Sequence, residues 1–142
     1  MYNIIQHAHS GLMWLVVAML MVSILFGMLK LVTKDETFSM KWFGLFKYTK
    51  HLLYLQFLLG LALYFLSPKV HFVSGFMKNE ELRFYGMEHP LMMLIAVGLV
   101  AWGLFKSKKK TEIFKKIQTI TIYYTIALVV IFMMVPWKAV LA

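Results

Sequence analysis

The chain has 142 residues, 61% of them hydrophobic, whereas a typical water-soluble domain is roughly 45–50% apolar. Its formal net charge is +9, but the lysines gather beside the ends of apolar segments, as they do in membrane proteins, so nucleic acid is not an expected partner. Because the sequence has no cysteine, disulfides, iron–sulfur clusters, cysteine nucleophiles and covalently attached c-type haem are excluded.

Four apolar segments of membrane-spanning length follow one another along the chain. They predict an all-α polytopic membrane protein, a single domain with four transmembrane helices in an up-down bundle. The predicted helices cover roughly residues 3–31, 42–66, 80–105 and 112–137. No basic residue precedes Lys30, so the first segment lacks the positive region of a secretory signal. We therefore expect it to remain as a helix of the mature protein.

Two local signals mark the ends of predicted helices. Pro68 follows the second apolar segment and cannot continue its helix. Asn79 precedes Glu80 and Glu81, an arrangement typical of an N-cap followed by carboxylates in the first helical turn.

The basic residues are unevenly distributed between the two ends of the predicted bundle. Eleven lie in or beside the connections at residues 32–41 and 106–111, and four lie near the opposite end. The eleven are Lys30, Lys34, Lys41, Lys47, Lys50, Lys106, Lys108, Lys109, Lys110, Lys115 and Lys116, and the four are Lys69, Lys78, Arg83 and Lys138. The positive-inside rule then predicts a bacterial inner-membrane protein with both termini in the periplasm.

The first helix carries His7 and His9 near its outer end, in "NIIQHAHSGLMW". Residues two apart on a helix point about 200° away from each other, so only one of the two faces the bundle interior. We expect His9 to face inward, because it begins a stripe spaced by four and three residues that continues through Met13, Val16, Leu20, Ser23 and Gly27. His7 would then face headgroups and water. The opposite choice stays open, since Gly11 leaves room for a flat cofactor beside His7.

His89 lies near the outer end of the third helix, in "YGMEHPLMM". Counted from Asn3 and Arg83, His9 and His89 each lie six residues inside their helices, a depth of about 9 Å. The first and third helices are diagonal neighbours in a simple up-down bundle. Two imidazoles at equal depth on facing helices predict the axial ligands of a six-coordinate b-type haem.

Several residues near His89 have expected roles beside it. Pro90 should kink the helix, because it cannot donate to the carbonyl four residues earlier. Glu88 is expected to hold a ligating histidine, to pair with Arg83, or to reach the outer surface. His71 and Arg83 are candidates for contacting the carboxylates of a haem.

His51 lies about 22 Å from the outer end of the second helix, too deep to bind the same iron as His9. We expect it to lie at the cytoplasmic interface and to hydrogen-bond a neighbour. A second metal site formed with Met19 is the alternative.

The twelve methionines support a rival interpretation. Met87, Met92 and Met93 lie around His89, and thioethers combined with imidazole suit Cu(I). Methionine is also a flexible apolar filler. A copper-handling membrane protein and a metal-free accessory subunit of a membrane complex therefore remain the alternatives.

The runs "HSGLMW", "HLLYLQFLLGLALYF" and "EHPLMMLIAVGL" resemble small four-helix bacterial membrane proteins of cytochrome-b type, over most of the chain. The resemblance implies haem b held by transmembrane histidines, here His9, His51 or His89. The fourth segment has no histidine, whereas larger diheme cytochromes b commonly place one there, and this argues against a second haem.

Two axial imidazoles leave a haem iron without an open position, so we expect an electron carrier more than a stand-alone enzyme. Its expected partners are the lipid bilayer, a quinone and a membrane or periplasmic redox protein; an enzyme of this kind would be a membrane oxidoreductase. Trp14, Tyr54, Gln56 and Tyr64 do not mark a quinone site, because such residues serve equally in packing or at the interface.

Overall fold

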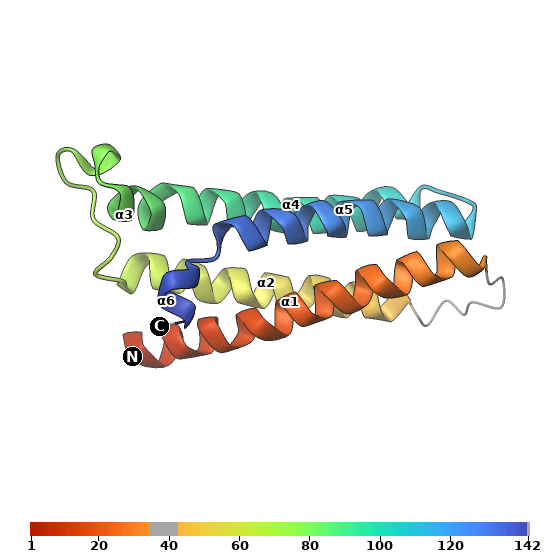
Figure 1. Cartoon of the computed structure of the whole chain (residues 1–142), viewed down its shortest axis with the longest axis horizontal. Helices are drawn as coiled ribbons and strands as arrows, with labels where there is room; N and C mark the ends of the chain where they lie inside the picture. Colours follow the sequence, from red (N-terminus) through yellow and green to blue (C-terminus); the bar gives the residue numbers. More distant parts are fainter. Residues whose placement is uncertain (35–42, 142) are drawn as a thin grey trace.

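The computed structural model describes residues 1–34 and 43–141, which form a long helical bundle (Figure 1). Within these residues no strand occurs, and four helical spans are long and apolar enough to cross a membrane. The predicted fold class, an all-α four-helix membrane bundle, is confirmed.

The helices follow one another in simple order along the chain. The first span is α1 (Tyr2–Thr33) and the second is α2 (Phe43–Leu66). A short η2 (Phe76–Lys78) lies in the connection to the third span, which consists of α3 (Glu80–Arg83), the π-helical η3 (Phe84–Glu88) and α4 (His89–Lys108). The fourth span is α5 (Ile113–Met134), and a short α6 (Trp137–Leu141) follows it.

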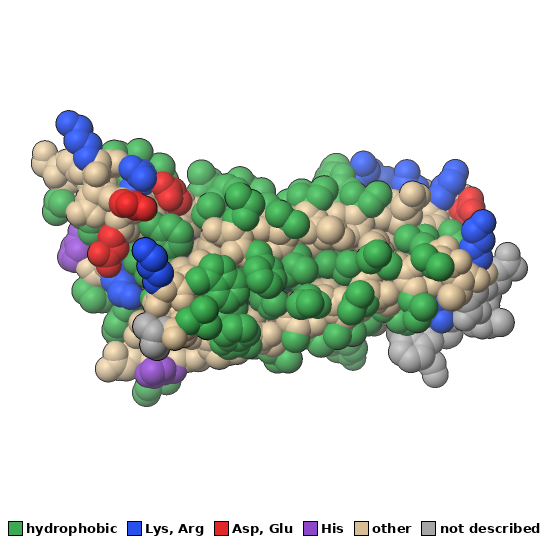
Figure 2. All heavy atoms as spheres, viewed as in Figure 1, with side chains coloured by type: hydrophobic (Ala, Val, Ile, Leu, Met, Phe, Trp, Pro, Cys, Tyr) green, Lys and Arg blue, Asp and Glu red, His purple; other side chains and the backbone are tan. Residues whose placement is uncertain are grey.

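The four membrane-spanning helices lie at the corners of a square. α1 packs on α2 and α5, and α4 packs on the same two helices, so α1 and α4 lie diagonally across the bundle. Both ends of the chain lie at the end of the bundle that also holds the α2–α3 connection, and the α4–α5 turn lies at the other (Figure 1). On the face drawn in Figure 2, charged side chains gather at the two ends and apolar ones cover the middle. A bilayer requires this distribution.

One face of each long helix builds the core. On α1 the buried residues are Met13, Val16, Val17, Leu20, Ser23 and Gly27. They contain the whole stripe that continues from His9, so the predicted inward face of α1 is confirmed. Deeper in the bundle, the buried Tyr124 of α5 donates a hydrogen bond from its hydroxyl to the carbonyl of Phe46, at 2.6 Å. This hydroxyl thus bonds within the protein, as a lipid environment demands.

The helix ends have local causes. The side chain of Asn79 accepts a hydrogen bond from the backbone N–H of Leu82 at 3.0 Å, so the predicted cap is confirmed. The sequence predicts a fourth helix that reaches residue 137, but α5 ends at Met134. Pro136 keeps Val135 in extended backbone, with φ −73° and ψ 131°, and α6 begins after it. Residue 42, the predicted start of the second helix, and residues 35–41 of the predicted connection lie outside the described residues.

The third span departs from regular α geometry just before His89. Residues 84–88 form one turn of π-helix, in which the N–H of His89 bonds to the carbonyl five residues earlier. The sequence predicts a kink at Pro90, and the wider turn of the structure ends at Glu88, two residues before that proline. Because Pro90 carries no N–H, it cannot bond to the carbonyl of Gly86. The hydroxyl of Tyr64 donates to that carbonyl at 2.9 Å and so joins α2 to the segment that carries His89.

Candidate functional site

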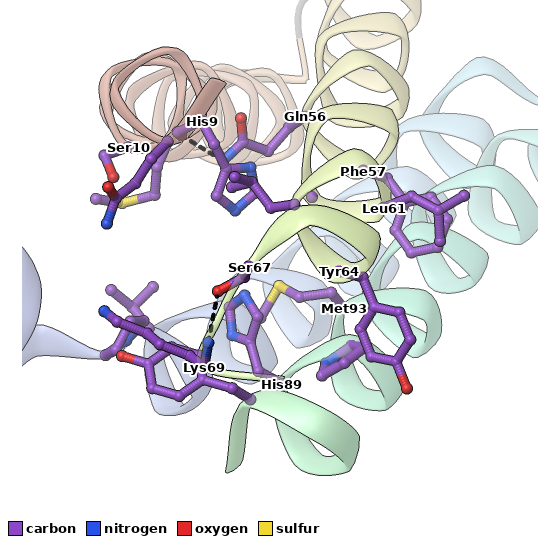
Figure 3. A pocket seen from close by; sticks show the side chains of 18 of the residues that line it. His9, Ser10, Gln56, Phe57, Leu61, Tyr64, Ser67, Lys69, His89 and Met93 are labelled. Atoms are coloured by element: carbon purple, nitrogen blue, oxygen red, sulfur yellow. Dashed lines mark hydrogen bonds between the residues drawn. The ribbon is translucent and has the colours of Figure 1, made fainter. Parts of the chain in front are cut away.

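The structure brings His9 of α1 and His89 of α4 together across the bundle. Their ring centroids lie 6.4 Å apart, and the ring planes are nearly perpendicular at 85°. Figure 3 shows the two side chains in one cavity, reached from opposite sides. Two imidazole nitrogens that share one metal ion at about 2 Å each place their ring centres about 6 Å apart. The observed separation of 6.4 Å is close to this value.

A cavity of about 220 Å³ surrounds this pair. Along α1 its lining extends from Tyr2 to Val16, which is about 21 Å at the rise of an α-helix, and His9 lies halfway. The deeper part of the cavity is lined by apolar side chains, and the outer part by polar side chains together with apolar ones. The deeper lining includes Val16, Leu53, Val97 and Ile131, and the outer lining includes Tyr2, Ser67, Lys69 and Tyr85.

The end of α5 orients His89. Met134 is the last residue of that helix, so its carbonyl lacks an intrahelical partner, and it lies 2.7 Å from Nδ1 of His89. A carbonyl can only accept, so in the neutral imidazole Nδ1 carries the proton and the lone pair of Nε2 is free. Metal-binding histidines are commonly oriented by a carbonyl at the other ring nitrogen. Pro136, by ending α5, thereby helps to set the direction of His89.

α2 positions His9. The side-chain amide of Gln56 donates to the backbone carbonyl of His9 at 2.8 Å. The imidazole lies against Gly60, where an added Cβ would come within 3.0 Å of Cε1 of His9. Within the described residues, Nδ1 of His9 and Oε1 of Gln56 are buried without a hydrogen-bond partner. Because buried polar atoms are rarely left unpaired, this imidazole is a group that a ligand or a bridging water would satisfy.

The other predicted site residues lie elsewhere. His7 is exposed on α1, His71 is exposed in the α2–α3 connection, and His51 is exposed on α2 with its ring 6.2 Å from that of Tyr54. Arg83 donates from Nε to Oε1 of Glu88 at 2.6 Å and from a terminal nitrogen to the carbonyl of Met77 at 2.9 Å. Of the three roles expected for Glu88, the structure therefore shows the pairing with Arg83. His7, His51, His71 and Arg83 are not part of the cavity lining.

The cavity also contains residues to which sequence analysis gave no role in the site. Met13 lines it four residues after His9, just as Met93 lines it four residues after His89. Met87 and Met92 are not among the lining residues. The spacing was an available signal for Met13, because residues four apart share a helix face.

Lys69 lines the outer part of the cavity, although sequence analysis counted it only as a loop charge. Its ammonium group lies 4.9 Å from the ring centroid of Tyr85, and its backbone N–H donates to the hydroxyl of Ser67 at 3.1 Å. The same hydroxyl lies 3.4 Å from that of Tyr2. The mouth of the cavity therefore joins one cation to several hydroxyl groups, a combination that suits an anionic group.

The number of protein ligands limits which metal cofactors the site can hold. Across residues 1–34 and 43–141, no three or more His, Asp or Glu side chains form a group that can hold a metal ion. Structural zinc takes four protein ligands and catalytic zinc takes three, whereas a six-coordinate haem iron needs only two, because the porphyrin supplies the others. The facing histidines equal the number of protein ligands that such an iron takes. Comparison of the chain with family models, with curated proteins and with solved structures finds no match.

Proposed function

We propose that this protein binds one haem b between His9 and His89 and carries electrons in a bacterial inner membrane. The observation that carries the proposal is the pair of imidazoles, 6.4 Å apart between ring centroids, inside a cavity of the bundle. Haem with two axial imidazoles supplies one-electron transfer, because its iron has no open position for oxygen chemistry.

The residues around the pair support this proposal by what each would do for such a group. The carbonyl of Met134 directs the free nitrogen of His89, and Gly60 leaves space for the ring of His9. The apolar deeper lining keeps water away and suits the apolar edge of a porphyrin. The carboxylates of a haem match the polar mouth at Lys69, which takes the place that sequence analysis gave to His71 and Arg83.

The position of the pair also bears on the redox partner. His9 lies seven residues from Tyr2, about 10 Å from the end of the bundle that holds both termini. If the lysine-rich end lies in the cytoplasm, the end that holds both termini faces the periplasm. The proposed electron route therefore joins a quinone in the bilayer to a periplasmic or membrane protein at this end.

Four single substitutions test the ligands. His9→Ala and His89→Ala should each abolish the low-spin haem spectrum, because each removes one axial nitrogen. His7→Ala and His51→Ala are matched controls on α1 and α2, and they should keep their haem because neither side chain lines the cavity. The measurement is haem per protein by pyridine haemochrome, together with the reduced α-band, on detergent-purified protein.

Each variant should first elute as the wild type does in size-exclusion chromatography, since a lost cofactor also lowers stability. Full haem content in both His9→Ala and His89→Ala would show that these two histidines are not the axial ligands. Loss of haem in His7→Ala with retention in His9→Ala would reverse the assignment on α1.

A second candidate function is Cu(I) handling, and one observation favours it. His9 and Met13 on α1, and His89 and Met93 on α4, place two imidazoles and two thioethers in one cavity, and Cu(I) accepts both ligand types. This set differs from the predicted one, since Met87 and Met92 are not among the lining residues.

The double variant Met13→Leu/Met93→Leu separates the two functions, because the exchange nearly conserves volume. A haem protein keeps its haem in this variant. A copper protein binds one equivalent of Cu(I) as wild type, binds no haem, and loses the copper in this variant but not in Met87→Leu/Met92→Leu.

A further inference from the structure

A second hollow lies on the outside of the bundle, away from the histidines. It is a groove of about 430 Å³ between α2 and α4, toward the end with the α4–α5 turn. Its lining consists of Lys50 from α2 and of Gly98, Ala101, Trp102, Leu104, Phe105 and Lys108 from α4. We call it the Lys50–Lys108 groove.

The apolar part of the groove is formed by a glycine, which leaves open space, and by two aromatic rings beside it. A Cβ added at Gly98 would meet nothing within 4 Å, so this position opens to empty space. Trp102 and Phe105 stack with ring centroids 5.4 Å apart, and each is about half exposed, at 52% and 48%. In a membrane such a surface contacts lipid, and a tryptophan such as Trp102 favours the level of the headgroups.

The two lysines give the groove a charge that ordinary lipid-facing surface lacks. Lys50 is half-buried, with its ammonium group 5.7 Å from the ring centroid of Tyr54, and Lys108 is the exposed last residue of α4. Within the described residues neither ammonium forms an ion pair with a carboxylate. Gly98 lies ten residues before Lys108, about 15 Å deeper along the helix. Lys108 therefore lies at the headgroup end, Lys50 lies seven residues inside the start of α2, and the hollow extends from Lys108 toward Gly98.

We propose that the Lys50–Lys108 groove binds one anionic phospholipid. The two ammonium groups hold its phosphate, and an acyl chain fills the hollow at Gly98. Basic pockets between transmembrane helices near the headgroup level recognise anionic lipids in this way. A zwitterionic lipid should bind less strongly, because the cationic group of its own headgroup repels the two lysines. The proposal does not depend on the cofactor of the histidine cavity.

Native mass spectrometry of the full chain tests the groove. The detergent-purified protein is mixed with phosphatidylglycerol or with phosphatidylcholine of the same acyl chains. Wild type should retain one phosphatidylglycerol at least fivefold more than phosphatidylcholine. Lys50→Gln/Lys108→Gln should lose this preference, because both cations are gone. Gly98→Leu should lower retention at least fivefold with both lysines present, because its side chain fills the hollow.

The matched control is Lys110→Gln/Lys115→Gln, which removes the same charge at the same end from two exposed residues outside the groove lining. It should retain phosphatidylglycerol as wild type does. An equal loss in the control would mean diffuse charge attraction and would overturn the proposal. So would a wild type without preference, or full retention in Gly98→Leu. All variants should melt within a few degrees of wild type, which separates lost binding from lost folding.

Discussion

At the scale of single residues, the hydroxyl of Tyr64 determines whether a carbonyl next to His89 has a hydrogen-bond partner. Pro90 removes the usual backbone donor to Gly86, and within a bilayer no bulk water replaces it. The donor comes instead from α2, at 2.9 Å. The local backbone around a candidate ligand therefore depends on a side chain from a different helix.

Tyr64→Phe should lower the free energy of unfolding by about 1–3 kcal/mol, because the carbonyl of Gly86 loses its donor while the aromatic ring stays. Denaturant unfolding in detergent micelles measures this. Tyr54→Phe is the control, since its hydroxyl forms no hydrogen bond among the described residues. Equal losses in the two variants would contradict the role of the Tyr64 hydroxyl.

Residue roles were predictable where they follow from helix geometry or residue type. The inward stripe that begins at His9 follows from spacing, and the cap at Asn79 follows from the preference of that side chain. The partner of His89 was not predictable, because Met134 lies 45 residues away in sequence and meets it only through the packing of α5 on α4. No local pattern encodes such a contact.

At the scale of secondary-structure elements, the space for the ring of His9 depends on the packing of α2 against α1. Gly60 of α2 has no side chain, and the imidazole of His9 occupies the place that one would take. By contrast, Gly11 on α1 faces open space, where a Cβ would meet nothing within 4 Å. The two glycines therefore form a natural pair for testing how far the cavity depends on this packing.

Gly60→Leu should remove most of the proposed haem, because the new side chain displaces the imidazole of His9 and fills cavity space. Gly11→Leu adds the same volume toward lipid and should leave the haem content unchanged. Pyridine haemochrome per protein measures both variants. A fully loaded Gly60→Leu protein would show that the cofactor does not lie against His9.

The four spans themselves were readable from the sequence, because length and hydropathy alone select membrane helices. Structural details inside the spans were harder to predict from the sequence. The end of α5 at Met134 follows from Pro136, a signal that was present but outweighed by the apolar run around it. The π-helical turn at residues 84–88 was not predicted, since it exchanges one backbone hydrogen-bond pattern for another without changing the hydropathy.

At the scale of the whole molecule, the histidine cavity and the lysine-rich α4–α5 turn lie at opposite ends of the bundle. Both termini and the α2–α3 connection share the end near the cavity mouth (Figure 1). Ten described lysines lie toward the other end, and the count of eleven against four basic residues in the whole sequence predicts which end enters the cytoplasm.

Reporter fusions at Lys34 and Val73 should give opposite compartment signals. The fusion at Lys34 should be active only for a cytoplasmic reporter and that at Val73 only for a periplasmic one, because the positive-inside rule holds the lysine-rich end in the cytoplasm. A cytoplasmic Val73 would invert the orientation and move the proposed haem to the other face of the membrane.

The π-helical turn before His89 affects how the third span tolerates a change of length. Such a turn accommodates one residue more than an α-helical turn does. Deleting one residue from 84–88 would therefore restore an α-helical turn while His89 and the rest of α4 keep their direction. A deletion between His89 and Met93 would rotate the residues on its two sides by about 100° relative to each other. The cavity can thus survive an evolutionary loss of one residue before His89, but not one within the following turn.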